Sequence, residues 1–260
     1  MLLKGKVAIV TGGGRGIGRA IARKFAGEGA AVVVAARTES EVHGAAKEIQ
    51  EAGGHAAAVV ADVSREVDCD KVVHLARETF GAINILVNNA ATYGPVRSVE
   101  KITPREWDQV MDVNLRGPFM LVRLVLPEMY ERGSGVILNV ITIAAKAAFQ
   151  FNGPYAASKA GLMGLTRTLA AEGARKGVRV NAVSPGPVPE TKMSQELYKG
   201  LAEQTQTESE KIYAQVLRGV LQGRPQTAEE IASAALFLVS DQASAITGQI
   251  LNVDGGMAFY

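Results

Sequence analysis

The stretch VAIVTGGGRGIGRAIARKFAG at residues 7–27 determines the fold of this chain. Val7–Val10 is a short apolar run of the kind that forms a buried strand. The glycines of TGGGRGIG, at Thr11–Gly18, allow the backbone to turn tightly directly after that strand. From Gly16 to Gly27 the apolar residues recur at helical spacing. The segment therefore predicts a strand, a glycine turn and a helix in direct succession.

The glycine turn has the features that a dinucleotide pyrophosphate requires. Glycine lets the backbone approach the phosphates closely, and the first turn of a helix offers free N–H donors and positive potential. The spacing is Gly12-x3-Gly16-x-Gly18, which differs from the more widespread G-x-G-x-x-G pattern. The turn alone leaves two interpretations open: a cofactor site, or a strand-to-helix connection without a ligand.

Strand-like apolar runs alternate with helix-like segments from one end of the chain to the other. This alternation favours an α/β fold with a parallel sheet covered by helices on both faces. Further strands are expected at Val32–Ala35, Ala57–Ala61, Ile83–Val87, Val136–Thr142, Val178–Ser184 and Ile250–Val253. Further helices are expected at Glu39–Ala52, from Ser64 to Phe80, from Thr103 to about Tyr130, at Tyr155–Lys176 and from Thr227 to Ser240.

Local signals place several helix boundaries. Ser64 is expected to cap its helix, and capping boxes begin at Thr103 and Thr227. The helix that starts at Thr103 is expected to bend near Gly117-Pro118. The segment at about Pro187–Thr207 is expected to be irregular, either as a lid or binding loop or as a mobile surface connection.

The composition excludes several classes of protein. The 260 residues include 28 Lys and Arg against 26 Asp and Glu, and a net charge of +2 gives no basis for binding nucleic acid or an anionic membrane. No apolar run reaches the ~18 residues of a membrane span, and no signal peptide is apparent, so we expect a cytoplasmic protein. Cys69 is the single cysteine, which excludes an internal disulfide. The three histidines (His43, His55 and His74) have no ligand spacing with Cys69, so no metal site is expected.

The end of the second predicted strand favours NADP over NAD as the cofactor. An acidic residue there would bind the 2′-hydroxyl of the adenosine ribose of NAD. The strand instead ends Ala35-Ala36-Arg37, and a guanidinium binds a 2′-phosphate through charge-assisted hydrogen bonds. Arg15, within the glycine turn, could reach the same phosphate. The alternative is that both arginines are solvated surface residues.

Tyr155 and Lys159 form a plausible acid/base pair. Four residues apart at the start of a predicted helix, they lie on one face within mutual reach. A free tyrosine has a pKa of about 10, and a neighbouring ammonium would lower that pKa by stabilising the phenolate. Many surface helices carry the same pair without any catalytic role.

Five motifs occur in the order and spacing typical of one enzyme family. They are TGGGRGIG, Asn88-Asn89-Ala90, Asn114 in VNLRG, Tyr155-Ala-Ala-Ser-Lys159, and NAVSPGPV at Asn181–Val188. Over essentially its whole length the chain thus resembles the short-chain dehydrogenase/reductase family. The resemblance implies a single-domain, doubly wound Rossmann fold over residues 1–260, with about seven strands and a substrate-binding loop and helix region at about 187–222.

The resemblance also implies roles for individual residues. Tyr155 would be the general acid in reduction and the base in oxidation, while Lys159 would bind the nicotinamide ribose and lower the Tyr155 pKa. Asn114 would hold a water or a backbone bend that links Lys159 to solvent. The implied cofactor-binding set is Thr11, Gly12, Gly14, Arg15, Gly16, Ile17, Gly18, Arg37, Asp62, Val63, Asn88, Ala90, Tyr155, Lys159, Pro185, Gly186, Val188 and Thr191.

Three positions depart from the family pattern. Thr142 stands where the family usually has the serine that positions the substrate oxygen; threonine keeps the hydroxyl, so we expect it to act. Ala91 replaces a usual glycine, and Thr191 lies one residue later than the commonest spacing. On the substrate side the resemblance places mostly apolar or aromatic residues: Tyr93, Phe149, Phe151, Met193, Leu197 and Tyr198.

These patterns together predict an NADP(H)-dependent oxidoreductase that acts on a neutral ketone or secondary alcohol, with a 3-oxoacyl thioester as another possible substrate. Asn114, Thr142, Tyr155 and Lys159 would form its catalytic tetrad. One alternative is an enoyl-thioester reductase on the same fold, although such relatives space the tyrosine and lysine more widely. The other is a non-catalytic NADP-binding sensor or scaffold. Related enzymes are usually tetramers or dimers, so we expect a homo-oligomer, with a tetramer favoured.

Overall fold

Seven parallel strands form one sheet in the computed structural model, which describes residues 1–259. The strand order is β3-β2-β1-β4-β5-β6-β7. This topology confirms the predicted α/β, doubly wound fold. The strands are β1 Val7–Thr11, β2 Ala31–Ala36, β3 His55–Val60, β4 Ile85–Asn88, β5 Gly135–Val140, β6 Val178–Pro185 and β7 Ile250–Val253.

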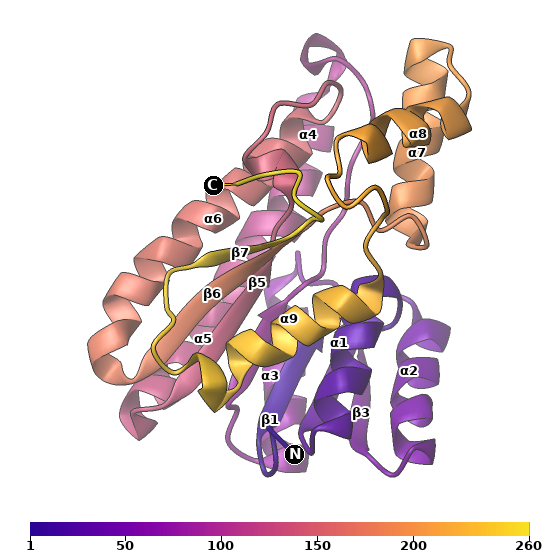
Figure 1. The fold of residues 1–260 in the computed structure, drawn as a ribbon. Helices are drawn as coiled ribbons and strands as arrows, with labels where there is room; N and C mark the ends of the chain where they lie inside the picture. Colours follow the sequence, from indigo (N-terminus) through magenta and orange to yellow (C-terminus); the bar gives the residue numbers. More distant parts are fainter. Residues whose placement is uncertain (260) are drawn as a thin grey trace.

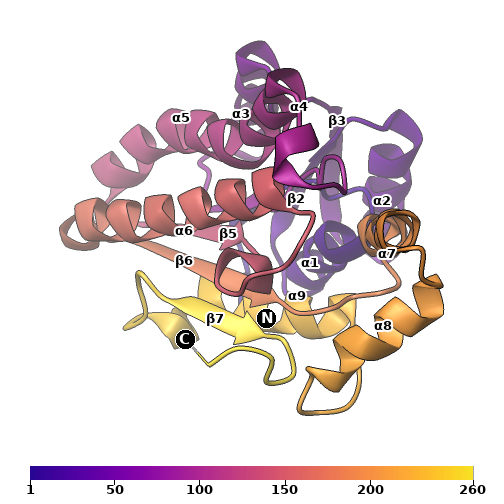
Figure 2. The same ribbon diagram turned by 90° about the horizontal axis from the view of Figure 1, so that it is seen from above.

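Helices cover both faces of the sheet (Figures 1 and 2). One face carries α1 Gly16–Gly27, α2 Glu39–Glu51 and α9 Ala228–Val239. The other face carries α3 Glu66–Phe80, α5 Gly117–Arg132 and α6 Gly153–Gly173, with α4 Pro104–Met111 leading into α5. The pair α7 Lys192–Thr205 and α8 Ser209–Arg218 projects beyond the carboxyl ends of the strands (Figure 1).

The strand order reverses between β1 and β4. The chain leaves β1 toward β2 and β3, then crosses back to place β4 on the other side of β1, so that Val10 is paired with both Val34 and Val87. At such a reversal the connections leave in opposite directions and open a crevice at the carboxyl ends of the strands. The glycine turn follows β1 directly at this crevice.

The long helix expected from Thr103 is divided into α4 and α5 close to the position of the predicted bend. Its capping box is present: the Glu106 N–H donates to the Thr103 hydroxyl oxygen, and the Thr103 N–H donates to the Glu106 carboxylate. A π-helical turn at Asp112–Arg116 then separates α4 from α5. The extra residue of a π turn shifts the helical hydrogen-bond ladder, and this turn lies directly before Gly117, where the sequence predicts a bend.

Two boundary predictions are wrong. The segment predicted as irregular, Pro187–Thr207, is mostly α7, because Thr191 accepts a hydrogen bond from the Ser194 N–H and begins the helix there. Ser64 does not cap α3, which begins at Glu66. The Ser64 hydroxyl donates instead to Asp62 Oδ1 at 2.7 Å. This local side-chain hydrogen bond competes with helix capping.

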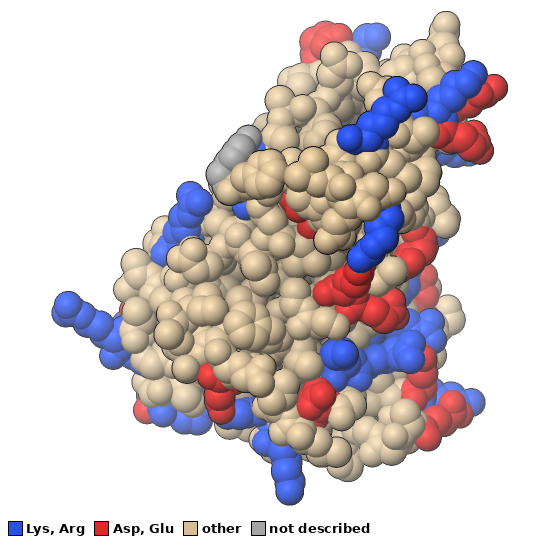
Figure 3. All heavy atoms as spheres, in the orientation of Figure 1, with Lys and Arg blue, Asp and Glu red and all other residues tan. Residues whose placement is uncertain are grey.

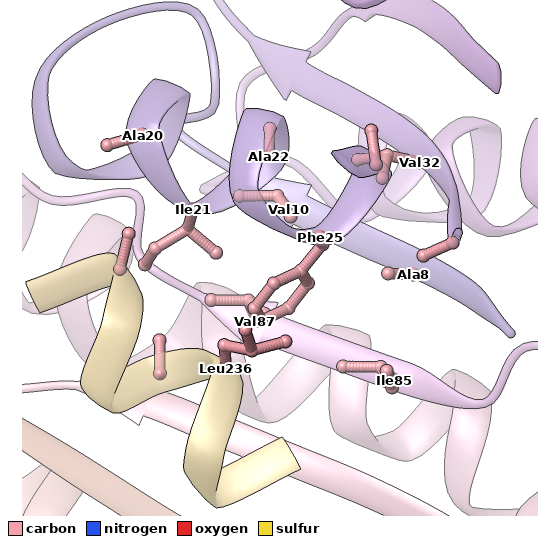
Figure 4. Packing of buried hydrophobic residues seen from close by; sticks show 14 of the residues in the cluster. Ala8, Val10, Ala20, Ile21, Ala22, Phe25, Val32, Ile85, Val87 and Leu236 are labelled. Atoms are coloured by element: carbon pink, nitrogen blue, oxygen red, sulfur yellow. The ribbon is translucent and has the colours of Figure 1, made fainter. Parts of the chain in front are cut away.

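The core has two layers, one on each face of the sheet. In the layer under α1 and α9, the fully buried ring of Phe25 lies close to Val87 of β4 and Leu236 of α9 (Figure 4). Elements from the two ends of the chain therefore meet over the central strands. This packing fixes where α1, and with it the glycine turn, sits on the sheet.

The face formed by β7 and α9 carries few charged side chains at its centre (Figure 3). Two apolar side chains there, Phe237 and Leu251, are each 37% exposed. Among the described residues, no helix combines the length and the apolar character that crossing a bilayer would require.

We predict that Phe25→Ala lowers the free energy of unfolding by about 3–5 kcal/mol, because it removes a fully buried ring and leaves a cavity. Urea denaturation measures this change. Val67→Ala, at a position 61% exposed on α3, is the control and should change the same free energy by less than about 0.5 kcal/mol. Similar effects of the two substitutions would contradict the role given to Phe25.

Candidate active site

A cavity of about 330 Å³ opens at the carboxyl ends of the strands. The predicted site residues that line it are Gly12, Gly14, Arg15, Gly16, Ile17, Gly18, Arg37, Asp62, Val63, Ala90, Tyr93, Thr142, Phe149, Tyr155, Lys159, Pro185, Gly186, Val188, Thr191, Met193, Leu197 and Tyr198. The fold thus gathers into one cavity residues that lie far apart in the sequence.

Within residues 1–259, the predicted site residues that do not line the cavity are Thr11, Asn88, Asn114 and Phe151. The Thr11 hydroxyl accepts hydrogen bonds from the N–H groups of Asn89 and Ala90, both at 3.1 Å. The Asn88 amide donates to Asn139 Oδ1 of β5 at 2.9 Å. Thr11 and Asn88 therefore fix the ends of β1 and β4. They affect the cavity only indirectly, by positioning the residues that line it.

Contacts within the chain require the glycines of the turn. A Cβ on Gly18 would lie 2.2 Å from the carbonyl oxygen of Gly12, and a Cβ on Gly12 would lie 2.8 Å from the Asn89 amide nitrogen. Gly12 also has a φ of 62°, in the left-handed region that favours glycine. No side chain caps α1, and its first turn contains no acidic residue. Its N–H groups are therefore available to an anion, and the turn fits a pyrophosphate.

The two arginines at the rim of the cavity differ in their surroundings. Arg37 is exposed, and no acidic side chain within residues 1–259 pairs with it. Arg15 is paired with Glu41, whose Oε1 lies 2.9 Å from its Nη1. Sequence reasoning missed Glu41, which lies on α2 and lines the cavity beside Arg15. Arg37 is therefore better placed than Arg15 to bind a phosphate group.

Tyr155, Lys159 and Thr142 meet at the bottom of the cavity. Tyr155 and Lys159 lie one turn apart on α6, and Thr142 follows β5. A side-chain hydrogen bond joins Thr142 to Tyr155. Lys159 is 1% exposed, and its Nζ donates to the carbonyl oxygen of Val140 at 2.7 Å. The threonine hydroxyl and the phenol can therefore address the same substrate oxygen.

Burial moves the pKa values of the pair in opposite directions. Desolvation raises the pKa of Tyr155 to about 12, opposed by the hydrogen bond with Thr142, and lowers the pKa of Lys159 to about 7. The Lys159 amine is directed at the Val140 carbonyl, and its expected lowering of the Tyr155 pKa stays a prediction. The site therefore holds a neutral phenol that can give up a proton.

The Asn114 amide contacts the peptide of Thr92 and not Lys159. It lies in the π-helical turn and is fully buried. Its Oδ1 accepts from the Thr92 N–H at 2.8 Å, and its Nδ2 donates to the Thr92 carbonyl at 2.9 Å and to the Ser158 hydroxyl at 3.0 Å. The Asn114 side chain therefore braces the wall of the cavity, and its expected role in linking Lys159 to solvent stays a prediction.

Thr191 lies over the glycine turn, where a Cβ on Gly16 would be 3.3 Å from its methyl group. Its hydroxyl donates to the Val188 carbonyl at 2.9 Å and accepts from the Ser194 N–H at 3.3 Å. The hydroxyl thus caps α7, and the expected contact of Thr191 with the cofactor stays a prediction.

The far end of the cavity is apolar and aromatic. Tyr93 and Tyr155 stack with ring centroids 4.6 Å apart, and Phe149 and Leu197 extend the wall. Phe151 is expected here from the sequence, but it has a φ of 63° and does not line the cavity. Sequence reasoning missed further apolar lining residues, namely Leu201, Val216 and Met257.

A buried carboxylate holds the segment that carries Met257. Asp254, 3% exposed, accepts N–H bonds from Gly256, Met257 and Ala258 at 2.9–3.2 Å. Asn252 also donates to the Ala258 carbonyl at 2.8 Å. No sequence motif predicts that Met257 lines the cavity, because its position depends on how the segment after β7 folds back.

No group of three or more His, Cys, Asp and Glu side chains that could hold a metal ion occurs in the described part of the chain.

We predict that the stability difference between the wild type and Lys159→Met depends on pH. Because the folded pKa of Lys159 is about 7 against 10.5 for a free lysine, the unfolded chain binds more protons between these values. The difference should therefore change in favour of the wild type as pH rises from about 7 toward 10, and stay constant below that range. Urea unfolding at several pH values measures it, with the exposed Lys47→Met as control. A pH-independent difference would contradict the assignment.

Comparison with known proteins gives consistent similarities over the whole chain. A family model described as "Enoyl-(Acyl carrier protein) reductase" matches residues 12–258. A 3β-hydroxysteroid dehydrogenase 1 of Eggerthella lenta is 40% identical over 264 residues, 99% of this chain and 95% of that protein. A 3-oxoacyl-[acyl-carrier-protein] reductase of Thermotoga maritima is 35% identical and covered to 99% on both sides. A crystal structure of an actinorhodin polyketide ketoreductase with NADPH matches with a TM-score of 0.93 at 35% identity, covering 98% of each chain.

Proposed function

Because the chain belongs to the short-chain dehydrogenase/reductase family and is an oxidoreductase of that fold, we propose that it transfers a hydride between NADP(H) and a ketone or secondary alcohol. One observation carries the proposal: Tyr155, hydrogen-bonded to Thr142, lies in the same cavity as the uncapped N-terminus of α1. An anion-binding turn and a buried proton donor are the two parts that carbonyl reduction requires.

The residues of the chain divide the work of the reaction. When bound, NADPH supplies the hydride that adds to the carbonyl carbon. The Tyr155 phenol donates its proton to the carbonyl oxygen, and the Thr142 hydroxyl holds that oxygen in place. Lys159, in its ammonium form, stabilises the phenolate that remains until solvent restores the proton. Alcohol oxidation uses the same groups in reverse, with the phenolate as base.

The preference for NADP over NAD rests on Arg37. Its guanidinium is exposed at the rim and unpaired within residues 1–259, so it can bind a 2′-phosphate. The pairing of Arg15 with Glu41 makes Arg15 a secondary contact. The similar actinorhodin polyketide ketoreductase was crystallised with NADPH, which supports the same choice.

The far end of the cavity favours a neutral, apolar substrate. Lys192 also lines the cavity, but most of the side chains expected on the substrate side are uncharged: Tyr93, Phe149, Leu197, Leu201, Val216 and Met257. Similar proteins are named for hydroxysteroids, 3-oxoacyl thioesters and polyketides. The matching family model is described as an enoyl reductase, but the four-residue spacing of Tyr155 and Lys159 favours carbonyl reduction. The homo-oligomeric state and the cytoplasmic location stay predictions.

The first test is loss of NADPH absorbance with a panel of ketones, quinones, 3-oxoacyl and enoyl thioesters. We expect turnover with a ketone or 3-oxoacyl substrate, and a fall of at least about a hundredfold in kcat for Tyr155→Phe, as for removal of a general acid. NADPH binding, followed by fluorescence, should be retained. Binding without turnover of any carbonyl would favour a sensor, and turnover by Tyr155→Phe would refute the assignment of the acid.

Cofactor preference is tested by Arg37→Asp. The carboxylate repels a 2′-phosphate and can bind a 2′-hydroxyl, so NADPH affinity should fall by at least about tenfold more than NADH affinity. Arg105→Asp makes the same charge change on exposed α4 and should leave the ratio of the two affinities unaltered. Equal losses for both cofactors would remove Arg37 from the 2′-phosphate site.

A further inference from the structure

We propose that Tyr93 is a positioning residue for the reaction: its ring lies against Tyr155 and fixes the orientation of the phenol toward Thr142. The proposal rests on the proposed function, because it concerns the acid assigned there. Tyr93 and Tyr155 are far apart in the sequence, yet their ring centroids are 4.6 Å apart and their planes 28° from parallel. Offset stacking of this kind stabilises a pair beyond the area it buries.

The residues before and after Tyr93 in the sequence hold it in position. The preceding residue, Thr92, is fixed through its N–H and its carbonyl by the Asn114 amide, at 2.8 and 2.9 Å. The following residue, Gly94, has a φ of 77°, and a Cβ there would lie 2.5 Å from Val110. The buried side chain of Asn152 lies near the Tyr93 hydroxyl and lines the same cavity. The ring therefore has little freedom to move away from Tyr155.

The backbone beneath the two rings is connected through one amide. Asn114 Nδ2 donates to the Ser158 hydroxyl at 3.0 Å, and this hydroxyl donates to the Tyr155 carbonyl at 2.7 Å. Asn114 thus joins the peptide of Thr92, next to Tyr93, to the first turn of α6. The contacts run from the Tyr155 carbonyl through Ser158 and Asn114 to the peptide of Thr92. From there the adjacent ring of Tyr93 leads back to the Tyr155 ring. Such a closed set of contacts holds a side chain within the narrow range that proton transfer needs.

Tyr93 also keeps water from one face of Tyr155. The stack covers that face, which contributes to the burial that raises the Tyr155 pKa to about 12. The titratable groups near the pair are Lys159 on α6 and Tyr198 on α7. The Tyr93 hydroxyl is itself titratable and interacts with Tyr155. Tyr93→Phe removes this hydroxyl alone, so the difference in Tyr155 titration between Tyr93→Leu and Tyr93→Phe reports the loss of the covering ring.

The test compares Tyr93→Leu, which removes the ring, with Tyr93→Phe, which keeps it. We expect Tyr93→Leu to lower kcat about three- to tenfold, the range set by an aromatic pair, with the KM for NADPH within about twofold of the wild type. The alkaline limb of the kcat profile should move to lower pH, because water then reaches the phenol. Tyr93→Phe should restore both values to within about twofold. Tyr130→Leu, on α5 and away from the cavity, is the control.

Two readouts keep this proposal separate from the function itself. The first is wild-type turnover against Tyr155→Phe, which tests the function alone. The second is ¹³C NMR of tyrosine Cζ, with the Tyr155 resonance assigned from Tyr155→Phe, which needs no substrate. Ionisation of Tyr155 should begin at lower pH in Tyr93→Leu. Unchanged titration and kcat would overturn the proposal, as would equal losses in Tyr93→Leu and Tyr93→Phe. Tyr93→Met replaces Tyr93→Leu if the latter does not fold.

Discussion

The whole site depends on how closely the chain passes itself at the glycine turn. Without side chains at Gly12 and Gly18, α1 can begin directly against the end of β1, and the Asn89 amide from beyond β4 can bond to the carbonyls of the turn at 2.8 and 3.2 Å. This contact fixes two neighbouring strands and one helix at the point where the strand order reverses. The uncapped start of α1 is thereby directed at the cavity, and every other wall is placed relative to it.

A second constraint is that burial shifts the pKa values of Tyr155 and Lys159 in opposite directions. The same desolvation that keeps the Tyr155 phenol protonated disfavours the charge of Lys159. The fold provides a neutral phenol, Tyr155, held between Thr142 and Tyr93. The Lys159 amine lies one helical turn away, and its charge depends on its surroundings.

Sequence reasoning succeeded where a local pattern has a local cause. The strands, the capping boxes at Thr103 and Thr227 and the meeting of Tyr155 with Thr142 follow from periodicity, side-chain chemistry and the family resemblance. It failed where distant segments decide the outcome. Glu41 reaches the rim because α2 packs beside the glycine turn, and Met257 lines the cavity because Asp254 folds its segment back. No motif records these contacts, since each depends on placement of an element by the sheet.

The contact between Phe25 and Leu236 joins α1 to α9 across nearly the whole length of the chain (Figure 4). During synthesis the ribosome delivers the amino-terminal strands long before α9, and domains begin to fold as they emerge. The part of α1 that packs against α9 therefore stays uncovered until α9 is available. Pairing of β1 with β4 is also non-local, which slows folding. The glycine turn, although first in sequence, therefore reaches its final environment late in folding.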